Sequence, residues 1–360
     1  MQWTNVFRLP LPLAEAIMED LYYGKREEGI LKYCAEKGLD RTKIVHFSVN
    51  ELIKSPRQVL LPRRHDDKII KDVASEVFRL LGTAIHYLLW AAAKRMNERG
   101  LTAYYTAEER LFYHFNVDGQ VVVVSGEPDL VNPAGVIDDY KVTAVWSWIK
   151  GIKDEWEKQL NLYAMFRTLA GKLTTGLSIC FILRDWNVNE TMQEGYAPAQ
   201  AQQTPVEMWD FERQKAYLME RIHLHLSVRD TADDELPECT GAEVGPNNEM
   251  WEKEEAYAVI REGGVRAAKV LILSKTQIER LPGETKEQHL LREANLDMDR
   301  RNDNPKIIKG KEKGYILEHR PGERTKCLRF CAANIVCNQF KEYSAAAFRG
   351  PARDKVEEVS

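Results

Sequence analysis

The sequence has no apolar run long enough to span a membrane, and its first residues do not form a basic region followed by an apolar stretch. These two absences predict a protein that is neither secreted nor inserted in a membrane, and therefore a cytoplasmic one. An excess of positive charge is also missing, because 51 lysines and arginines stand against 55 acidic residues, and the formal net charge is −4. A protein of this charge binds nucleic acid only if its positive charge gathers in one groove.

There is no internal repeat and no long low-complexity segment. The 360 residues are 44% hydrophobic and 29% charged, which is ordinary for a globular protein that buries a substantial core. Changes in composition along the chain predict four segments. These are an N-terminal helical segment at 1–66, a core at 67–235, a C-terminal cysteine-bearing region at 236–345 and a disordered tail at 346–360.

Residues 126–141, with the sequence GEPDLVNPAGVIDDYK, are expected to form two short strands joined by a turn. Side chains alternate along a strand, so Asp139 and Lys141, two positions apart, point to one face, and Asp138 points to the other. The turn can bring Asp129 beside the first two. Two carboxylates with a lysine suit a hard divalent cation and a water molecule activated next to it, which is the chemistry of phosphodiester cleavage.

Two predicted helices flank this hairpin in the sequence. Residues 67–98 show the apolar periodicity of one long helix, in which His86 follows Gly82 by four residues. Gly82 is expected to let the helix approach the sheet closely, and His86 to offer an imidazole nitrogen to a metal ion. A helix after the hairpin carries Gln159 and Tyr163 on one face. Taken alone, the histidine is as well explained as a packed residue, and the Gln–Tyr pair as an exposed and a core side chain.

Together these blocks resemble the RecB-type branch of the PD-(D/E)XK nuclease superfamily, whose members include viral and recombination exonucleases. The resemblance extends over about residues 45–185. It is carried by three blocks in the order and spacing of that branch: Gly82-Thr83-Ala84-Ile85-His86, Asp129-x(9)-Asp139-x-Lys141 and Gln159-Leu160-Asn161-Leu162-Tyr163.

The resemblance implies an α/β fold, with a central mixed sheet flanked by helices as in the restriction-endonuclease-like core. It also implies a deoxyribonuclease that depends on Mg2+ or Mn2+. Such an enzyme would act as an exonuclease on DNA ends or single strands in recombination, repair or replication, with proteins of those processes as further partners. If the protein is viral, its place is the host cell cytoplasm. The residues implied are Asp129, Asp139, Lys141, Gln159 and Tyr163 for catalysis, and His86, Asp129 and Asp139 for the metal.

Three alternatives remain open at this point. A catalytically silent DNA-binding or scaffolding module could keep the same fold, although such a module has no need of two acids facing a phosphate. An RNA nuclease would differ only in its substrate. An enzyme of another class could use a redox cluster, but the sequence has no flavin, nicotinamide or radical-cofactor motif.

Three of the six cysteines lie within eleven residues, Cys327, Cys331 and Cys337, which packing explains poorly. In an intracellular chain such a group suggests metal ligands before disulfides. A metal centre needs a fourth ligand, and Cys239 is chosen because it begins the same region and follows a proline. The other candidates for the fourth position are Cys34, Cys180 and His319.

Four thiolates suit either a [4Fe–4S] cluster or a tetrahedral zinc ion. The x3 and x5 spacings do not match the paired CxxC motifs of structural zinc sites. The resemblance to iron–sulfur exonucleases favours the cluster, with zinc as the alternative, although Ser55 stands where those relatives carry their first cysteine ligand.

Two stretches are locally basic, at residues 57–71 and 300–313. Either could contact the phosphates of DNA, and either could be an ordinary solvated surface. Glu109, which precedes the hairpin on a predicted strand, is left out of the site because a carboxylate at a strand edge is more simply solvated.

Overall fold

The structure is a computed structural model. It describes residues 2–18, 23–100, 105–107, 109–241, 248–254, 256–261, 267–272, 281–285, 289, 292, 315–320 and 322–348. The chain divides into two compact units, one made of residues 1–238 and 332–360 and the other of residues 239–331. The second basic stretch, at 300–313, lies outside the described residues.

These bounds differ from the segments expected from the sequence. Residues 1–66 do not stand apart from the core, because β2 (Val45–Ser48) pairs in parallel with β6 (Gln120–Gly126) in one sheet. The first unit ends three residues beyond the expected boundary at 235, and the chain after residue 331 belongs to it again. Helix α12 runs to Phe348 within the predicted tail, and the remaining tail residues lie outside the described part.

The first unit is a mixed α/β structure. Its helices are α1 Leu11–Met18, α2 Tyr23–Lys37, α3 Val49–Leu52, α4 Pro56–Arg64, α5 Val77–Glu98, α6 Val145–Ile149, α7 Asp154–Leu169, α8 Phe211–Ser227 and α12 Asn338–Phe348, with 3-10 turns η1 Asp66–Lys68, η2 Val73–Glu76 and η3 Val188–Glu190. Its strands are β1 Gln2–Thr4, β2, β3 Ile70–Asp72, β4 Thr106–Ala107, β5 Leu111–Val117, β6, β7 Leu130–Val131, β8 Val136–Thr143, β9 Gly176–Leu183 and β10 Ala201–Val206.

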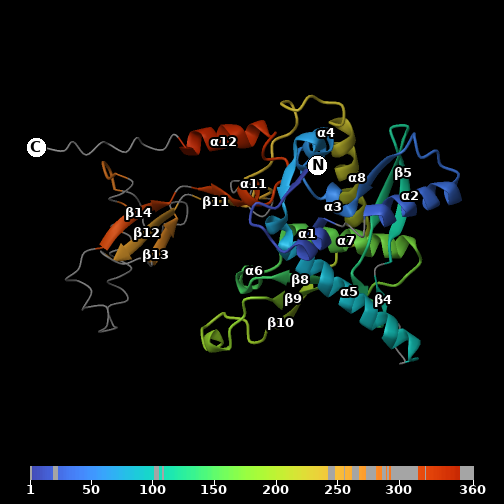
Figure 1. Cartoon of the computed structure of the whole chain (residues 1–360), viewed down its shortest axis with the longest axis horizontal. Helices are drawn as coiled ribbons and strands as arrows, with labels where there is room; N and C mark the ends of the chain where they lie inside the picture. The colour runs from blue at the N-terminus through green and yellow to red at the C-terminus, as the bar shows by residue number, and fades with distance from the viewer. Residues whose placement is uncertain are drawn as a thin grey trace, which may run out of the picture. The chain divides into compact units, whose positions relative to one another are not determined.

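This unit contains two mixed sheets, and Figure 1 labels β10, β9, β8 and β4 of the larger one. In the larger one, of order β10-β9-β8-β7-β4, strands β8 and β9 are parallel and the other neighbours are antiparallel. In the smaller one, β6 pairs in parallel with β2 and antiparallel with β5. A β1–β3 pair forms a separate two-stranded ribbon.

Helix α7 packs between the strands and α8, and it carries the main core. Leu160 and Phe166 are completely buried, and Trp156 packs edge-on against Phe181 of β9 with ring centroids 5.7 Å apart. Acidic residues in its first turn favour the positive end of the helix dipole. This helix confirms the prediction made from the sequence, and its burial is what brings its Gln–Tyr face to the sheet.

The expected hairpin is also present. Strands β7 and β8 are antiparallel, and the turn between them closes with a 2.9 Å hydrogen bond from the Gly135 N–H to the Asn132 carbonyl oxygen. Gly135 has φ of 86°, a conformation that a side chain would strain.

The prediction of one helix over 67–98 is wrong at its start, because α5 begins only at Val77. The preceding residues form η1, β3 and η2, and β3 pairs with β1 from the beginning of the chain. The Asp72 carboxylate ends this strand by accepting hydrogen bonds from the N–H groups of Val6 (2.8 Å) and Ala74 (3.0 Å). Local periodicity does not report such long-range partners.

The polar sequence of residues 186–207, with two prolines, is typical of a loop, but the structure places β10 within it. This strand is polar and contains Pro205, so its sequence lacks the apolar alternation that predicts a strand. Both features fit its place at the end of the sheet, where one edge needs no N–H donor and alternate side chains face solvent.

The second unit contains β11 Glu252–Lys253, β12 Ala256–Arg261, β13 Ala267–Ile272, β14 Tyr315–Arg320, β15 Glu323–Arg324 and α11 Thr325–Arg329. Strand β12 lies between β13 and β14 and pairs antiparallel with both. None of the helices in the described part of the chain combines the length and the apolar character needed to cross a membrane.

The basic stretch at 57–71 is largely occupied by contacts within the protein. Arg57 is 3% exposed, and its guanidinium donates hydrogen bonds to the carbonyl oxygens of Leu236 and Pro237. Arg63 pairs with Glu51 and Arg64 with Asp233, each at 2.7 Å.

Replacing Arg57 with alanine is therefore expected to lower the free energy of unfolding by about 2–4 kcal/mol, because two carbonyl groups lose a charged donor and a buried side chain is removed. Urea denaturation followed by circular dichroism measures the loss. Arg213→Ala is the control, since the Arg213–Glu207 pair is exposed and worth little. Equal midpoints for the two variants would contradict the buried role of Arg57.

Candidate active site

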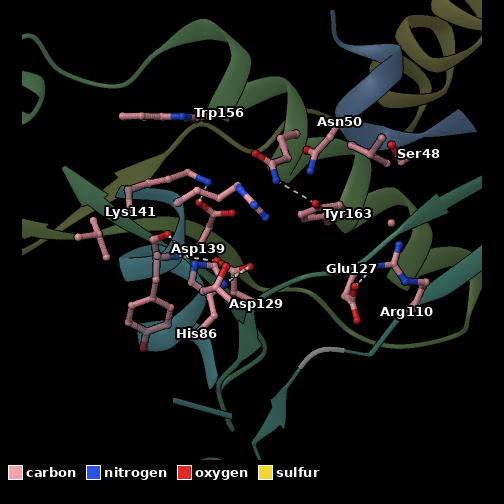
Figure 2. A pocket seen from close by; sticks show the side chains of 18 of the residues that line it. Ser48, Asn50, His86, Arg110, Glu127, Asp129, Asp139, Lys141, Trp156 and Tyr163 are labelled. Atoms are coloured by element: carbon pink, nitrogen blue, oxygen red, sulfur yellow. Dashed lines mark hydrogen bonds and ion pairs between the residues drawn. The ribbon is translucent and has the colours of Figure 1, made fainter. Parts of the chain in front are cut away.

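A pocket of about 510 Å³ opens in the first unit where α5, α7 and β8 meet (Figure 2). Among the residues that line it are all six that the sequence analysis assigns to catalysis or to a catalytic metal: His86, Asp129, Asp139, Lys141, Gln159 and Tyr163. The three blocks of the chain that carry them are thus brought together by the fold.

Asp139 and Lys141 point into the pocket from the same face of β8, as strand alternation predicts. The Asp139 side chain is 1% exposed, whereas Lys141 keeps 22% of its side chain accessible, and Nζ of Lys141 lies 2.5 Å from Oδ2 of Asp139. The neighbouring Asp138 faces the other side, where it accepts hydrogen bonds from Asn132 (3.2 Å) and Gln203 (3.0 Å), and from the Ser178 hydroxyl.

Asp139 has few partners for a buried carboxylate. Apart from the ion pair of Oδ2 with Lys141, neither carboxylate oxygen has a hydrogen-bond partner among the described residues. Burial raises the pKa of Asp139 from its ordinary value of 3.8 to about 6, since removal from water outweighs the attraction of Lys141. Buried polar oxygens without donors are rare in proteins, and they fit a ligand for a cation.

Asp129 lies just before β7 and faces His86 of α5. The Asp129 carboxylate accepts a 2.8 Å hydrogen bond from the Tyr140 N–H, and its other oxygen is 3.3 Å from Nδ1 of His86. The second ring nitrogen of His86, Nε2, is 3.3 Å from the Tyr140 carbonyl oxygen. Figure 2 shows His86 and Asp129 next to Asp139 and Lys141.

These carboxylates favour the charged forms of the two basic groups of the site. Burial disfavours the charge on His86, but the contact with Asp129 and the nearby Asp139 outweigh it, so its pKa is raised. For Lys141 burial also acts against the charge, and the carboxylates of Asp139 and Asp129 again prevail and raise the pKa. Each cation is thus matched by an adjacent acid.

Gln159 and Tyr163 share the face of α7 that lines the pocket. Nε2 of Gln159 donates a 2.8 Å hydrogen bond to the Tyr163 hydroxyl, and both side chains are buried, at 9% and 3% exposure. The end of β6 comes close to this helix at Gly126, where a Cβ atom would lie 3.0 Å from the Tyr163 ring and 3.2 Å from Phe166. The glycine therefore lets α7 approach, which the sequence did not indicate.

The role expected for Gly82 is wrong. It lines the pocket on α5, but a Cβ atom there would meet no atom within 4 Å, so it does not serve close packing against the sheet. Its effect is to leave the pocket wall open.

Several lining residues were missed. Arg110, just before β5, pairs with Glu127, and Arg79 of α5 pairs with Glu76 at 2.6 Å. No sequence signal pointed to these residues, because their place in the pocket depends on pairing between distant elements. Trp156 could have been found, since it lies one helical turn before Gln159; its ring centroid is 6.0 Å from Nζ of Lys141. The omission of Glu109 holds, as its carboxylate pairs with Lys172 and does not line the pocket.

A metal ion in this pocket would need several donor atoms close together. In the described part of the chain no three His, Cys, Asp or Glu side chains converge as a ready group of ligands. In the pocket His86 and Asp129 contact each other, and the unsatisfied oxygens of Asp139 are the features that fit a hard cation.

The six cysteines all lie among the described residues, and none is joined in a disulfide. Cys239, Cys327 and Cys331 belong to the second unit and Cys337 to the first. The cysteine centre stays a prediction from the sequence.

No family model matches the chain, and no curated protein matches it. Among solved structures, the one titled "Crystal structure of SSO0001" is similar at 18% sequence identity, with a TM-score of 0.36. The alignment covers 57% of this chain and 87% of that one. At this TM-score the likeness supports no conclusion on fold or activity, so function is inferred from the site.

Proposed function

We propose that this protein is a metal-dependent deoxyribonuclease with a restriction-endonuclease-like core, acting in the cytoplasm on DNA ends or single strands. Recombination, repair and replication are the processes that use such an activity, and their proteins would be its partners. The observation that carries the proposal is the state of Asp139. It is a buried carboxylate whose Oδ1 has no hydrogen-bond donor among the described residues and whose Oδ2 meets only the Lys141 ammonium, and it lies close to the Asp129–His86 pair.

Asp139 and Asp129 would hold one or two Mg2+ or Mn2+ ions, together with His86 and the Tyr140 carbonyl group. A bound cation lowers the pKa of a coordinated water molecule and offsets the charge that grows on a phosphate.

Lys141 has a raised pKa and so stays cationic, which suits it to stabilise negative charge in the transition state rather than to accept a proton. The Gln159–Tyr163 pair, fixed in the wall by its own hydrogen bond, would position the scissile strand or the lysine.

The direct test is to incubate the purified protein with labelled linear, nicked and circular DNA, with Mg2+, with Mn2+ and with a chelator. Metal-dependent release of nucleotides from linear DNA supports an exonuclease, and cutting of circles an endonuclease. Labelled RNA in parallel decides between the two nucleic acids. Tight DNA binding with no cleavage under any of these conditions would instead indicate the silent binding module.

We also propose that Cys239, Cys327, Cys331 and Cys337 bind a [4Fe–4S] cluster that acts as a structural clasp. Protein purified without oxygen is expected to be brown and to contain about four iron and four sulfide ions per chain. Iron, sulfide and zinc analysis with a visible spectrum measures this. A colourless protein with one zinc ion would replace the cluster by zinc, and a protein with neither metal would contradict the centre.

A further inference from the structure

The N-terminal half of α5 carries a row of positions that leads out of the pocket. Phe78, Gly82 and His86 follow one another at intervals of four residues, so they lie along one side of the helix over roughly 12 Å. Gly82 and His86 line the pocket, and beside Gly82 the wall is open. This side of the helix therefore leads from the Asp129–His86 pair, past the open space at Gly82, to the exposed Phe78.

At the end of this row Phe78 and Arg184 form a pair. The Phe78 side chain is 59% exposed, and the guanidinium carbon of Arg184 lies 4.2 Å from the centroid of its ring. The backbone N–H of Arg184 donates a 2.9 Å hydrogen bond to the carbonyl oxygen of Thr143. Thr143 is the last residue of β8 and lines the pocket. The ring is thus held beside the pocket by a planar cation, with much of its surface left accessible.

A second pair of the same kind, Trp146 and Lys150, lies shortly after Thr143 in the chain. Trp146 of α6 is 62% exposed, and Nζ of Lys150 lies 5.6 Å from its ring centroid. The start of α6 is tied to the residue after Arg184, because the Val145 N–H donates a 2.7 Å hydrogen bond to the Asp185 carboxylate. Among the described residues neither Arg184 nor Lys150 has an acidic partner at ion-pair distance.

A single exposed aromatic side chain needs no explanation. An exposed ring held by an unneutralised cation, one helical turn from an open wall of a pocket suited to phosphodiesters, fits a base and its phosphate. In a duplex the faces of the bases are covered by their neighbours, so a base that stacks on protein comes from an unpaired strand or a frayed end. Charge and ring chemistry thus favour single-stranded nucleic acid over duplex.

We propose that the substrate reaches the site as an unpaired DNA strand that passes Gly82 and stacks a base on Phe78, while Arg184 contacts its phosphates. This inference rests on the proposed nuclease function and adds to it the class of substrate and a specificity-determining residue.

The test is the binding of fluorescein-labelled oligothymidylate, and of a blunt hairpin duplex, measured by anisotropy in the presence of a chelator. Phe78→Ala is expected to weaken binding of the single strand by about 5- to 150-fold, which corresponds to roughly 1–3 kcal/mol for one stacked base, with little change for the duplex. Phe78→Trp, which keeps an aromatic ring, is expected to bind the single strand like the wild type. Gly82→Leu, which fills the open space beside α5, is expected to weaken single-strand binding.

Tyr87→Ala is the matched control, because Tyr87 is an equally exposed aromatic residue of α5 at 58% and lies nine positions after Phe78, on the opposite side of the helix. It is expected to bind both ligands like the wild type. Single-strand binding by Phe78→Ala equal to that of the wild type would overturn the proposal. So would an equal loss for single strand and duplex, or a wild type that binds no single strand.

Failure of the two proposals can be told apart. Binding that depends on Phe78, without cleavage in Mg2+ or Mn2+, would remove the nuclease and keep the strand-binding surface. Cleavage that is indifferent to Phe78 on both substrates would keep the nuclease and remove the stacked strand.

Discussion

Asp129→Asn, Asp139→Asn and Lys141→Met are each expected to reduce the rate of DNA cleavage by a factor on the order of a hundred to a thousand or more. The two carboxamides keep the shape of the carboxylates but cannot hold a divalent cation with comparable strength. The methionine removes positive charge from the place where the phosphate gains negative charge. Initial rates on labelled linear DNA with Mg2+ or Mn2+ measure the loss, and circular dichroism checks that the fold persists.

The control for this series is Asp138→Asn, the same chemical change one position along β8. Asp138 faces away from the pocket, and an asparagine oxygen can still accept from Ser178 and Gln203. Its rate should stay close to that of the wild type. A loss in Asp138→Asn as large as in Asp139→Asn, or full activity in any of the three pocket variants, would show that the site is assigned to the wrong residues.

The second large effect concerns stability without metal. Because the pKa of Asp139 is raised from 3.8 to about 6 in the folded state, folding favours the protonated carboxyl group. Its contribution to stability is complete below about pH 4 and is lost as the pH rises through about 6, which amounts to about 3 kcal/mol. The asparagine of Asp139→Asn cannot ionise. The free energy of unfolding of the wild type is therefore expected to fall relative to that of the variant as the pH rises from 4 to 8.

Urea denaturation between pH 4 and pH 8, in the presence of a chelator, measures this difference. Lys141→Met provides a second arm, since removing the attractive cation raises the pKa of Asp139 further and moves the loss to higher pH. Addition of Mg2+ at pH 8 should stabilise the wild type more than Asp139→Asn, because the carboxamide is a much weaker ligand for the ion than the carboxylate. Parallel pH curves for the wild type and Asp139→Asn would refute the unfavourable burial of Asp139.

The parts of the site that the sequence predicts are those set by local geometry. Alternation along a strand places Asp139 and Lys141 on one face and Asp138 on the other, and the structure confirms it. Helical spacing in the same way places Gln159 and Tyr163 together on α7. These relations involve neighbours within four residues, so any fold that keeps the strand and the helix keeps them.

Other predictions failed because they depend on distant parts of the chain. The start of α5 is displaced to Val77 by pairing of β3 with β1, almost seventy residues away. Strand β10 forms because β9 offers it an edge, although its own sequence is polar. The close approach of a helix to the sheet, expected at Gly82, occurs at Gly126, where α7 approaches β6. Gly82 has open space beside it.

The sequence by itself determined which side chains could act together, since residue type and spacing of two or four positions are local properties. Only the tertiary structure decided that Asp139 is buried with a donor at Oδ2 alone, the Lys141 ammonium, because burial depends on packing with segments from other parts of the chain, such as β9 next to β8. It also decided the roles of two arginines. Arg57 belongs to a run of basic residues, yet it is buried and bound to carbonyl oxygens. Arg184 has no such run around it, yet it is the cation that lies against Phe78 beside the pocket. Burial and charge pairing arise from contacts between distant segments, and a pattern of neighbouring residues does not contain them.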